Sequence, residues 1–128
     1  MGEHPNATAF RQLIDAFNSG DMEGSAALID NDVVWYSIGM DEPVRGADAL
    51  AANAMNFPEG LEVVAEVHDV VANDDHVVGL INATATLRGE SFEYRTAEIL
   101  HFADGKVTER WAFSDDTARI NKFFGQFA

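Results

Sequence analysis

Four long segments with the residue pattern of β-strands follow one another through the second half of the chain, and they constrain its fold more than any other feature. They cover residues 61–71, 76–88, 90–102 and 106–114 and are rich in β-branched and aromatic residues. Short runs of Asn, Asp and Gly separate them, and these residues suit the backbone angles of tight turns. Strands joined by tight turns pair antiparallel. The sequence therefore predicts a four-stranded antiparallel meander.

Two helices are predicted at the start of the chain. Apolar residues at positions i, i+3, i+4 and i+7 predict an amphipathic helix over residues 6–18, with Gly20 placed to end it. Asp21 is expected to cap a second helix that runs to about Ile29, with Met22, Ala26 and Ile29 on its inner face.

A strand and two more helices complete the predicted elements. Residues 32–38 are β-branched and aromatic, which predicts a strand. A third helix is expected to continue until Pro58 stops it. A last helix, with apolar residues again at helical spacing, is capped by Ser114 or by an aspartate that follows it. This order predicts an α+β domain in which helices cover one face of a sheet.

Composition narrows the class of protein. The length of 128 residues suits one domain, and no linker or repeat interrupts residues 1–128. The net charge of −14 repels nucleic-acid phosphates and anionic membranes, so we expect neither as a partner. The absence of cysteine excludes disulfides and thiolate sites. No basic leader and no apolar run of roughly 20 residues is present, which favours a soluble cytoplasmic protein.

Three stretches in order carry a resemblance to a known family: FNSGDMEGSAALIDNDVVWY, then PVRG, then HFADGKVTERWAFSDD. They resemble SnoaL-like members of the nuclear transport factor 2-like (ketosteroid isomerase-like) superfamily. The resemblance implies a cone-shaped, cystatin-like fold, in which a curved antiparallel sheet wraps around N-terminal helices and leaves an apolar pocket at its open end. It also implies a two-fold homodimer through the convex face of the sheet.

The turn at residues 103–105 decides which side chains face the pocket, because a slip of one residue exchanges the two faces of a strand. A three-residue loop with a bulge pairs Glu98 with Arg110, whereas a two-residue turn pairs Glu98 with Trp111. The resemblance favours the bulged form. It implies that Glu98, Leu100, Arg110 and Ala112 face the cavity and that Trp111 and Phe113 lie on the convex face.

The same parity turns Ile81, Ala83, Ala85 and Leu87 inward. Small alanines on a curved inner face either leave volume for a ligand or lie beneath a helix, and the sequence does not separate these alternatives. The predicted substrate-binding residues are Leu13, Phe17, Trp35, Ser37, Phe57, Ala83, Ala85, Leu87, Leu100 and Ala112.

Catalytic roles transfer to this chain only in part. Of the isomerase positions, the base falls near Ser37 and the tyrosine near Leu13, so only the acid position is filled by an acid, Glu98. The acid–base pair of SnoaL-like cyclases falls on Ala112 and Glu98. We therefore predict Glu98 as a general acid or base, Arg110 as the group that orients a polar substrate group, and Asp115 as a second candidate acid. The alternative is that Glu98 and Arg110 form a buried salt bridge with a structural role.

Two hypotheses of function follow. The first is a small-molecule pocket protein, a cofactor-independent isomerase, cyclase, dehydratase or hydrolase acting on a small apolar or aromatic substrate. The second is a non-catalytic ligand-binding or protein-association domain of the same fold. No cofactor motif is present, and the His68-Asp69 and Asp74-Asp75-His76 groups lack the spacing of a metal site, so we expect neither a cofactor nor a metal. The convex face with Thr84, His101, Trp111 and Phe113 is the expected homodimer surface.

Overall fold

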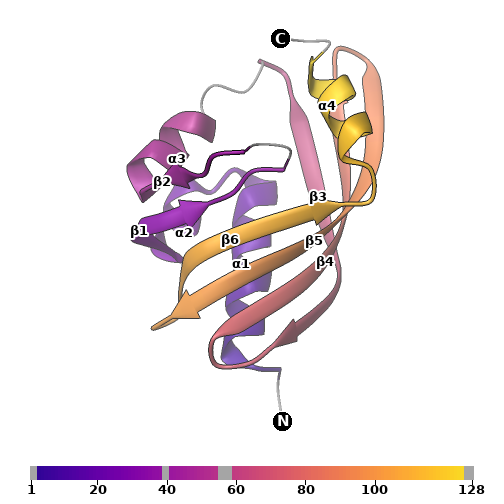
Figure 1. Ribbon diagram of the computed structural model, residues 1–128. Helices are drawn as coiled ribbons and strands as arrows, with labels where there is room; N and C mark the ends of the chain where they lie inside the picture. The colour runs from indigo at the N-terminus through magenta and orange to yellow at the C-terminus, as the bar shows by residue number, and fades with distance from the viewer. Residues whose placement is uncertain (1–2, 39–40, 55–58, 126–128) are drawn as a thin grey trace.

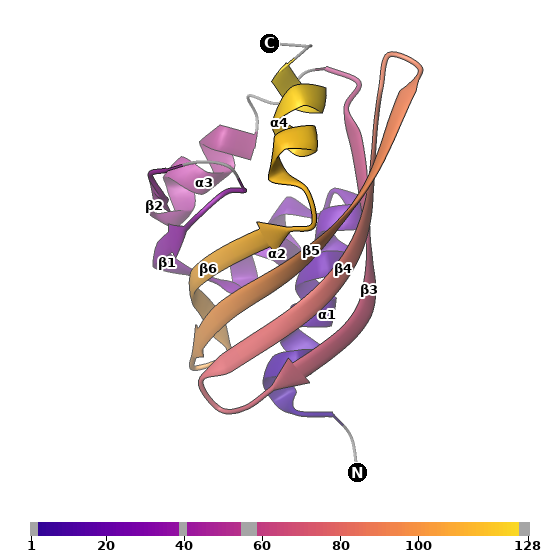
Figure 2. The same cartoon turned by 45° about the vertical axis from the view of Figure 1, so that its right-hand side comes forward.

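The computed structural model of the protein describes residues 3–38, 41–54 and 59–125. The elements in chain order are α1 (Pro5–Ser19), α2 (Met22–Ala27), β1 (Ile29–Trp35), β2 (Val44–Arg45), α3 (Ala47–Ala54), β3 (Glu62–Ala72), β4 (His76–Leu87), β5 (Glu90–Ala103), β6 (Lys106–Ser114) and α4 (Thr117–Gly125). The strands form one curved sheet that bends around α1, as Figures 1 and 2 show from two sides. The α+β fold and the order of its main elements agree with the sequence prediction.

The sheet has the strand order β2-β1-β6-β5-β4-β3. Strands β3 to β6 form the predicted antiparallel meander. The sheet as a whole is mixed, because β1 pairs with β6 in parallel. The short strand β2, which pairs with β1, was not predicted, since two residues are too few to give a period-2 pattern.

The predicted extent and orientation of the second helix are wrong. Helix α2 ends at Ala27 and has no buried residue, and its Met22 side chain is 55% exposed. Ile29 belongs to β1 instead. The backbone N–H of Val107 donates to the carbonyl of Leu28, so pairing with β6 takes over from the helix at this point. The strand therefore covers residues 29–35 rather than 32–38.

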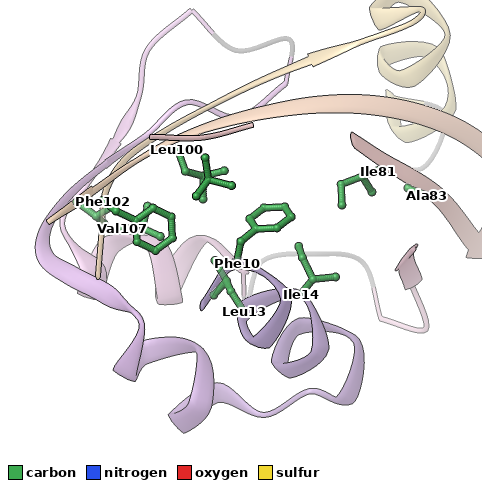
Figure 3. Close-up of a cluster of buried hydrophobic side chains, with 10 residues drawn as sticks. Phe10, Leu13, Ile14, Ile81, Ala83, Leu100, Phe102 and Val107 are labelled. Carbon is green, nitrogen blue, oxygen red and sulfur yellow. The ribbon is translucent and has the colours of Figure 1, made fainter. Parts of the chain in front are cut away.

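Helix α1 packs its predicted apolar face against the sheet. Phe10 is fully buried, and Figure 3 shows its ring reaching from α1 toward the strands, with Leu13 and Ile14 beside it on the helix. A Cβ atom at Gly79 of β4 would clash with the Phe10 ring, so only glycine allows this close approach. Phe10 belongs to a buried cluster that also includes Val33, Val77, Ile81, Ala83, Leu100, Phe102 and Val107.

A second buried cluster lies under the C-terminal helix. It joins Ala85 and Leu87 of β4 and Phe92 of β5 to Ile120 and Phe123 of α4. Helix α4 lies at the end of the sheet opposite the N-terminus (Figure 2). Because Ala83 belongs to the cluster with α1 and Ala85 to the cluster with α4, both alanines pack in cores that helices cover. Of the two alternatives for these alanines, the structure favours packing beneath helices.

The β5–β6 hairpin combines features of both predicted registers and matches neither. Asp104 and Gly105 both have positive φ angles, 53° and 78°, and form a two-residue turn. Farther along β6, Val107 pairs with Phe102 and Glu109 pairs with His101, so Thr108 is an extra residue in a β-bulge. Glu98 consequently pairs with Ala112, not with Arg110 or Trp111. The bulge still turns Arg110 and Ala112 inward, as predicted.

The two aspartates before α4 have different roles. Asp116 caps the helix as predicted, because its Oδ1 accepts a hydrogen bond from the N–H of Arg119 at 3.1 Å. Asp115 instead joins the strands: its N–H donates to the carbonyl of Arg95, and its Oδ1 accepts from the N–H of Arg95, both at 3.1 Å. Pro58, the predicted end of α3, lies outside the described residues.

Candidate functional site

An ion pair between β5 and β6 occupies the inner face of the sheet. The Nε and Nη2 atoms of Arg110 each lie 2.9 Å from Oε1 of Glu98. Both side chains are 11% exposed, so the pair is largely screened from water. Because charges are buried in proteins only at a cost, a pair in this position requires close geometry to be stable. The structure thus brings together the two residues predicted as the centre of the site.

Strand β1 fixes the guanidinium of Arg110 from the other side. Nη1 donates to the backbone carbonyl of Tyr36 at 3.0 Å, and the guanidinium carbon lies 4.7 Å from the centre of the Trp35 ring. Such a cation–π contact and a second hydrogen bond restrict the rotation of the side chain. Arg110 therefore holds Glu98 in one orientation, and Trp35 acts at this site through Arg110.

The two oxygens of the Glu98 carboxylate differ. Both contacts from Arg110 fall on Oε1, and within the part of the chain that the structure describes Oε2 accepts no hydrogen bond. An oxygen that is held in place without a partner is suited to accept a hydrogen bond from a ligand or a proton from a substrate.

Two polar residues that sequence reasoning missed continue from Glu98 along the same face of β5. Tyr94 is partly buried and packs against both buried clusters. Burial, followed by the charge of Glu98, raises the pKa of Tyr94 above its usual value of 10.0, and Arg110 opposes this shift. The phenol is consequently protonated at neutral pH. The signal in the sequence was the period of two that joins Tyr94 and Glu98.

Thr96 lies between Tyr94 and Glu98 on this face and is 7% exposed. Its Oγ1 atom is buried and has no hydrogen-bond partner among the described residues. A buried hydroxyl without a partner costs roughly 1–3 kcal/mol of stability, and native proteins contain few of them. Three polar side chains in succession therefore point inward from a strand whose other inward residues include Phe92, Leu100 and Phe102.

A surface cleft of about 370 Å³ lies after the end of β1, beside β6 and the start of α4. Its lining consists of Tyr36, Ser37, Ile38, Trp111, Ala112, Phe113 and Thr117. Tyr36 is the residue whose carbonyl accepts from Arg110, and Ala112 is the ladder partner of Glu98. The volume lies within the range of roughly 300–1,000 Å³ that is typical of small-ligand sites. The cleft therefore adjoins residues that contact the ion pair, although neither Glu98 nor Arg110 lines it.

A second cleft, of about 410 Å³, lies between α1 and α2. Gln12, Asp15, Ala16, Ser19, Asp21, Gly24, Ala27 and Leu28 line it. It contains none of the predicted site residues and no buried charged group, so its larger volume does not make it the better candidate.

The other predicted site residues fall into different surroundings. Leu13, Ala83 and Leu100 belong to the cluster around Phe10, and Ala85 and Leu87 belong to the cluster beneath α4. Ser37 and Ala112 line the cleft of about 370 Å³. Phe17 is 49% exposed, and Phe57 lies outside the described residues. Asp115 is exposed and bonded to the backbone of Arg95, and the structure does not join it to the Glu98–Arg110 pair.

The convex face carries a different set of side chains. Trp111 and Phe113 are 40% and 56% exposed. Nε2 of His101 lies 3.8 Å from Oε2 of Glu109. The rings of His76 and His101 meet edge to face, with centroids 4.7 Å apart. Within the described ranges no group of three His, Asp or Glu side chains is arranged to hold a metal ion. None of the described helices is both long and apolar enough to cross a bilayer.

Solved structures with the same architecture include proteins of several kinds. A nuclear transport factor 2-like protein of unknown function from Burkholderia pseudomallei has a TM-score of 0.84 and 20% identity, with 95% of this chain and 98% of that chain covered. An epoxide hydrolase from M. tuberculosis has a TM-score of 0.81 and 15% identity, with 95% and 90% covered. A Δ5-3-ketosteroid isomerase from Mycobacterium sp. has a TM-score of 0.75 and 21% identity, with 87% and 93% covered.

At these identities the structural likeness establishes the fold. Among curated proteins, none matches the sequence. The family model of the SnoaL-like domain matches residues 10–110, which is most of the chain and contains both Glu98 and Arg110. The chain therefore has the fold of nuclear transport factor 2-like proteins and belongs to the SnoaL-like domain family.

Proposed function

We propose that the protein binds a small, largely apolar or aromatic molecule in the cleft beside β1 and α4, and that Glu98 acts on it as a general acid or base. The observation that carries this proposal is the asymmetry of the Glu98 carboxylate, in which Arg110 holds Oε1 and Oε2 is open. The cleft is lined by Ala112, the ladder partner of Glu98, and its aromatic lining suits an apolar ring.

The reaction class that fits is a proton transfer without a cofactor. A carboxylate oxygen takes a proton from an acidic C–H, from a hydroxyl or from water, and the resulting carboxylic acid returns a proton to another atom of the substrate. Isomerisation, cyclisation, dehydration and hydrolysis all use such a step. Arg110 contributes by keeping the carboxylate in place.

The comparisons support this range of reactions and do not narrow it. An epoxide hydrolase and a ketosteroid isomerase share the fold. By the family resemblance, the base of an isomerase falls near Ser37 and its tyrosine near Leu13, so we do not propose the ketosteroid reaction for this chain.

An alternative function is a non-catalytic domain for ligand binding or protein association. The exposure of Trp111 and Phe113 on the convex face favours it, because large aromatic side chains exposed together are typical of interfaces. We infer a homodimer through this face. Sedimentation of the wild type should give a dimer at micromolar concentration, and Trp111→Glu should shift it toward the monomer. A wild type that sediments only as a monomer would contradict this inference.

A thermal-shift screen tests the proposed function directly. The ligands are steroids, aromatic polyketides, epoxides, terpenoids and small carboxylic acids, and a ligand that binds only the folded protein raises the midpoint of unfolding. We expect one class to stabilise the wild type and to lose this effect, or change it, in Glu98→Gln. Glu66→Gln is the matched control, because Glu66 is exposed on β3 and makes no part of the cleft.

Turnover of the class that binds is then measured for the same three proteins. Loss of activity in Glu98→Gln with retention in Glu66→Gln supports the acid–base role. Full turnover by Glu98→Gln would contradict the acid–base role of Glu98. Ligand binding without turnover in the wild type would favour the alternative, non-catalytic function.

A further inference from the structure

We propose that the backbone of β6 at Ala112 binds an N-acylamino carbonyl compound, a small molecule in which an amide N–H and a carbonyl group stand on one carbon that also carries an apolar side chain. The N–H of the ligand donates to the carbonyl of Ala112, and the carbonyl of the ligand accepts from the N–H of Ala112. This inference rests on the ligand-binding part of the proposed function and adds the substrate class to it.

The parallel ladder between β1 and β6 ends before the cleft. Its last pair is Trp35 with Arg110, and one further hydrogen bond runs from the N–H of Tyr36 to the carbonyl of Arg110 at 2.8 Å. Strand β6 continues beyond this point to Ser114 and toward α4, as Figure 2 shows. Among the strands that the structure describes, only β5 pairs with this last part of β6.

The backbone of Ala112 faces the open side of β6. In a regular strand the N–H and C=O of one residue point to the same neighbouring strand, and those of the next residue point to the other. The carbonyl of Arg110 accepts from the chain that follows β1, and the N–H of Asp115 donates to Arg95 of β5. The register of β5 and β6 is regular between these two bonds. Ala112, two residues after Arg110, therefore points toward the side of β1.

Both backbone groups of Ala112 lack a partner on this side among the residues that the structure describes. A continued parallel ladder would join the N–H of Ala112 to the carbonyl of Tyr36 and the carbonyl of Ala112 to the N–H of Ile38, and neither bond forms. The carbonyl of Tyr36 accepts from Nη1 of Arg110 at 3.0 Å instead. A backbone donor and a backbone acceptor thus remain open next to each other, as on an edge strand.

The surroundings of Ala112 limit the size of the ligand. Ala112 belongs to the lining of the cleft of about 370 Å³, and so does Thr117, where α4 begins. The added ligand therefore has room beside only a short length of β6, and the volume lies near the lower end of the range for small-ligand sites. One acylamino unit with its side chain fits these limits better than an extended peptide. The apolar side chains of the lining are Tyr36, Ile38, Trp111 and Phe113.

The pairing pattern of strands gives the ligand its functional groups. Two opposite residues in a hydrogen-bonded antiparallel pair exchange both N–H···O bonds, so each residue uses its own N–H and its own C=O. A ligand with the sequence H–N–C–C=O reproduces one such residue. The net charge of −14 disfavours a free carboxylate at the carbonyl position. The carbonyl of the ligand consequently belongs to an ester, an amide or a ketone.

Three uncharged probes test this assignment by titration at pH 6.5, followed by the amide NMR spectrum of the protein. N-acetyl-L-leucine methyl ester carries both groups, N-acetyl-N-methyl-L-leucine methyl ester lacks the N–H, and N-(3-methylbutyl)acetamide lacks the ester carbonyl. We expect the wild type to bind the first probe about tenfold more tightly than either of the others, because each loses one hydrogen bond. Equal affinity for all three probes would overturn the proposal.

Amide hydrogen exchange examines the edge itself. In the free protein the N–H of Ala112 should exchange about tenfold or more faster than the N–H groups of Trp111 and Phe113, which face β5. The two-group probe should slow exchange at Ala112, whereas N-(3-methylbutyl)acetamide should not. A slowly exchanging N–H at Ala112 in the free protein would contradict an open edge. Protection at Ala112 that increases with protein concentration would assign the edge to a second copy of this chain and overturn the proposal.

Ala112→Pro removes the backbone donor. Proline is tolerated in a strand where its N–H has no ladder partner, so this variant should fold, whereas Phe113→Pro removes a bond to β5 and should be the more destabilised of the two. Ala112→Pro should weaken binding of the two-group probe about tenfold and leave N-(3-methylbutyl)acetamide unchanged. Circular dichroism checks the fold. If Ala112→Pro does not fold, the exchange rates of the wild type decide the question.

The outcomes separate this inference from the proposed function. If another ligand class stabilises the protein in the thermal-shift screen and the three acylamino probes do not bind, the inference fails and the proposed function stands. If the probes bind in the expected order and Glu98→Gln turns over its substrate fully, the acid–base role fails and the inference stands. If neither the screen nor the probes show binding, both fail.

Discussion

Arg110 reaches Glu98 diagonally across β5 and β6, and its Nε and Nη2 atoms share a single oxygen, Oε1. In the ladder itself Glu98 lies opposite Ala112, and Arg110 lies opposite Leu100. A side-by-side bidentate arrangement would engage both carboxylate oxygens, whereas the diagonal one leaves Oε2 without a contact from Arg110. The diagonal offset therefore makes the ion pair compatible with ligand binding.

Arg110→Met should lower the free energy of unfolding by about 3 kcal/mol, because it leaves the buried Glu98 carboxylate without its cation. Urea denaturation followed by tryptophan fluorescence measures this loss. Arg11→Met is the control, since Arg11 forms a pair of the same 2.9 Å length with Glu3 but is 44% exposed, and it should cost less than about 1 kcal/mol. Adding Glu98→Gln to Arg110→Met should recover part of the loss. Equal costs for the two arginine variants would contradict a buried, charged pair.

Tyr94 should ionise above pH 10, since burial and the charge of Glu98 raise its pKa from 10.0. The unfolded chain then loses this proton first, so stability is unaffected below pH 10 and falls as the pH rises through the folded-state pKa. Absorbance of the phenolate at about 295 nm follows the titration, and Tyr94→Phe and Tyr36→Phe assign the two tyrosines. Glu98→Gln should lower the pKa of Tyr94. A titration of Tyr94 at or below pH 10 in the wild type would refute this reading.

Thr96→Val should raise the free energy of unfolding by about 1 kcal/mol, because it replaces an unpartnered buried hydroxyl by a methyl group of the same shape. Thr86→Val is the comparison, since Thr86 shares a 3.1 Å hydrogen bond with Ser91 and is partly exposed. Both substitutions introduce valine and therefore the same gain in strand preference. The difference between their changes in unfolding free energy therefore reports the contribution of the hydroxyl group. Thermal and urea unfolding measure it. If Thr96→Val is the more destabilising of the two, the hydroxyl has a partner in solution.

Gly79→Ala should cost about 1–3 kcal/mol, because the added methyl group meets the Phe10 ring in a packed core. Phe10→Leu in the same chain should relieve part of this cost, and the coupling energy from the double-mutant cycle measures the contact. Gly79 lies opposite Glu98 in the ladder, so ligand affinity should fall with Gly79→Ala as well. Additive effects of the two substitutions on stability would show that ring and glycine are not in contact.

The regular elements of this fold were predictable because each has a local signal. The period of two in β3 to β6 and the helical spacing in α1 indicate two-faced elements, whereas the inward orientation of both Glu98 and Arg110 was predicted only through the family resemblance. Parallel pairing of β1 with β6 has no such signal, since it joins segments far apart in the chain. The end of α2 depends on the same pairing, through Leu28.

The missed members of the site have a different explanation. Tyr94 and Thr96 share the parity of Glu98, but each is an ordinary strand residue, and only the absence of partners in the folded structure sets them apart. The cleft also depends on tertiary structure, because β1 and β6 stop pairing after Trp35 and Arg110. The sequence alone indicates which residues share one face of a strand. The fold decides which polar side chains on that face remain without a hydrogen-bond partner.

Thr108 is a single residue whose presence decides the orientation of a whole strand segment. It is the extra residue of the β6 bulge, and its hydroxyl donates to the carbonyl of His101 at 3.2 Å. If Thr108 were paired with His101 in a regular ladder, the two-residue turn at Asp104 and Gly105 would place Arg110 on the convex face and Trp111 in the interior. The bulge thus decides which of the guanidinium and the indole enters the interior, and a hairpin that paired Thr108 would invert the site in one step.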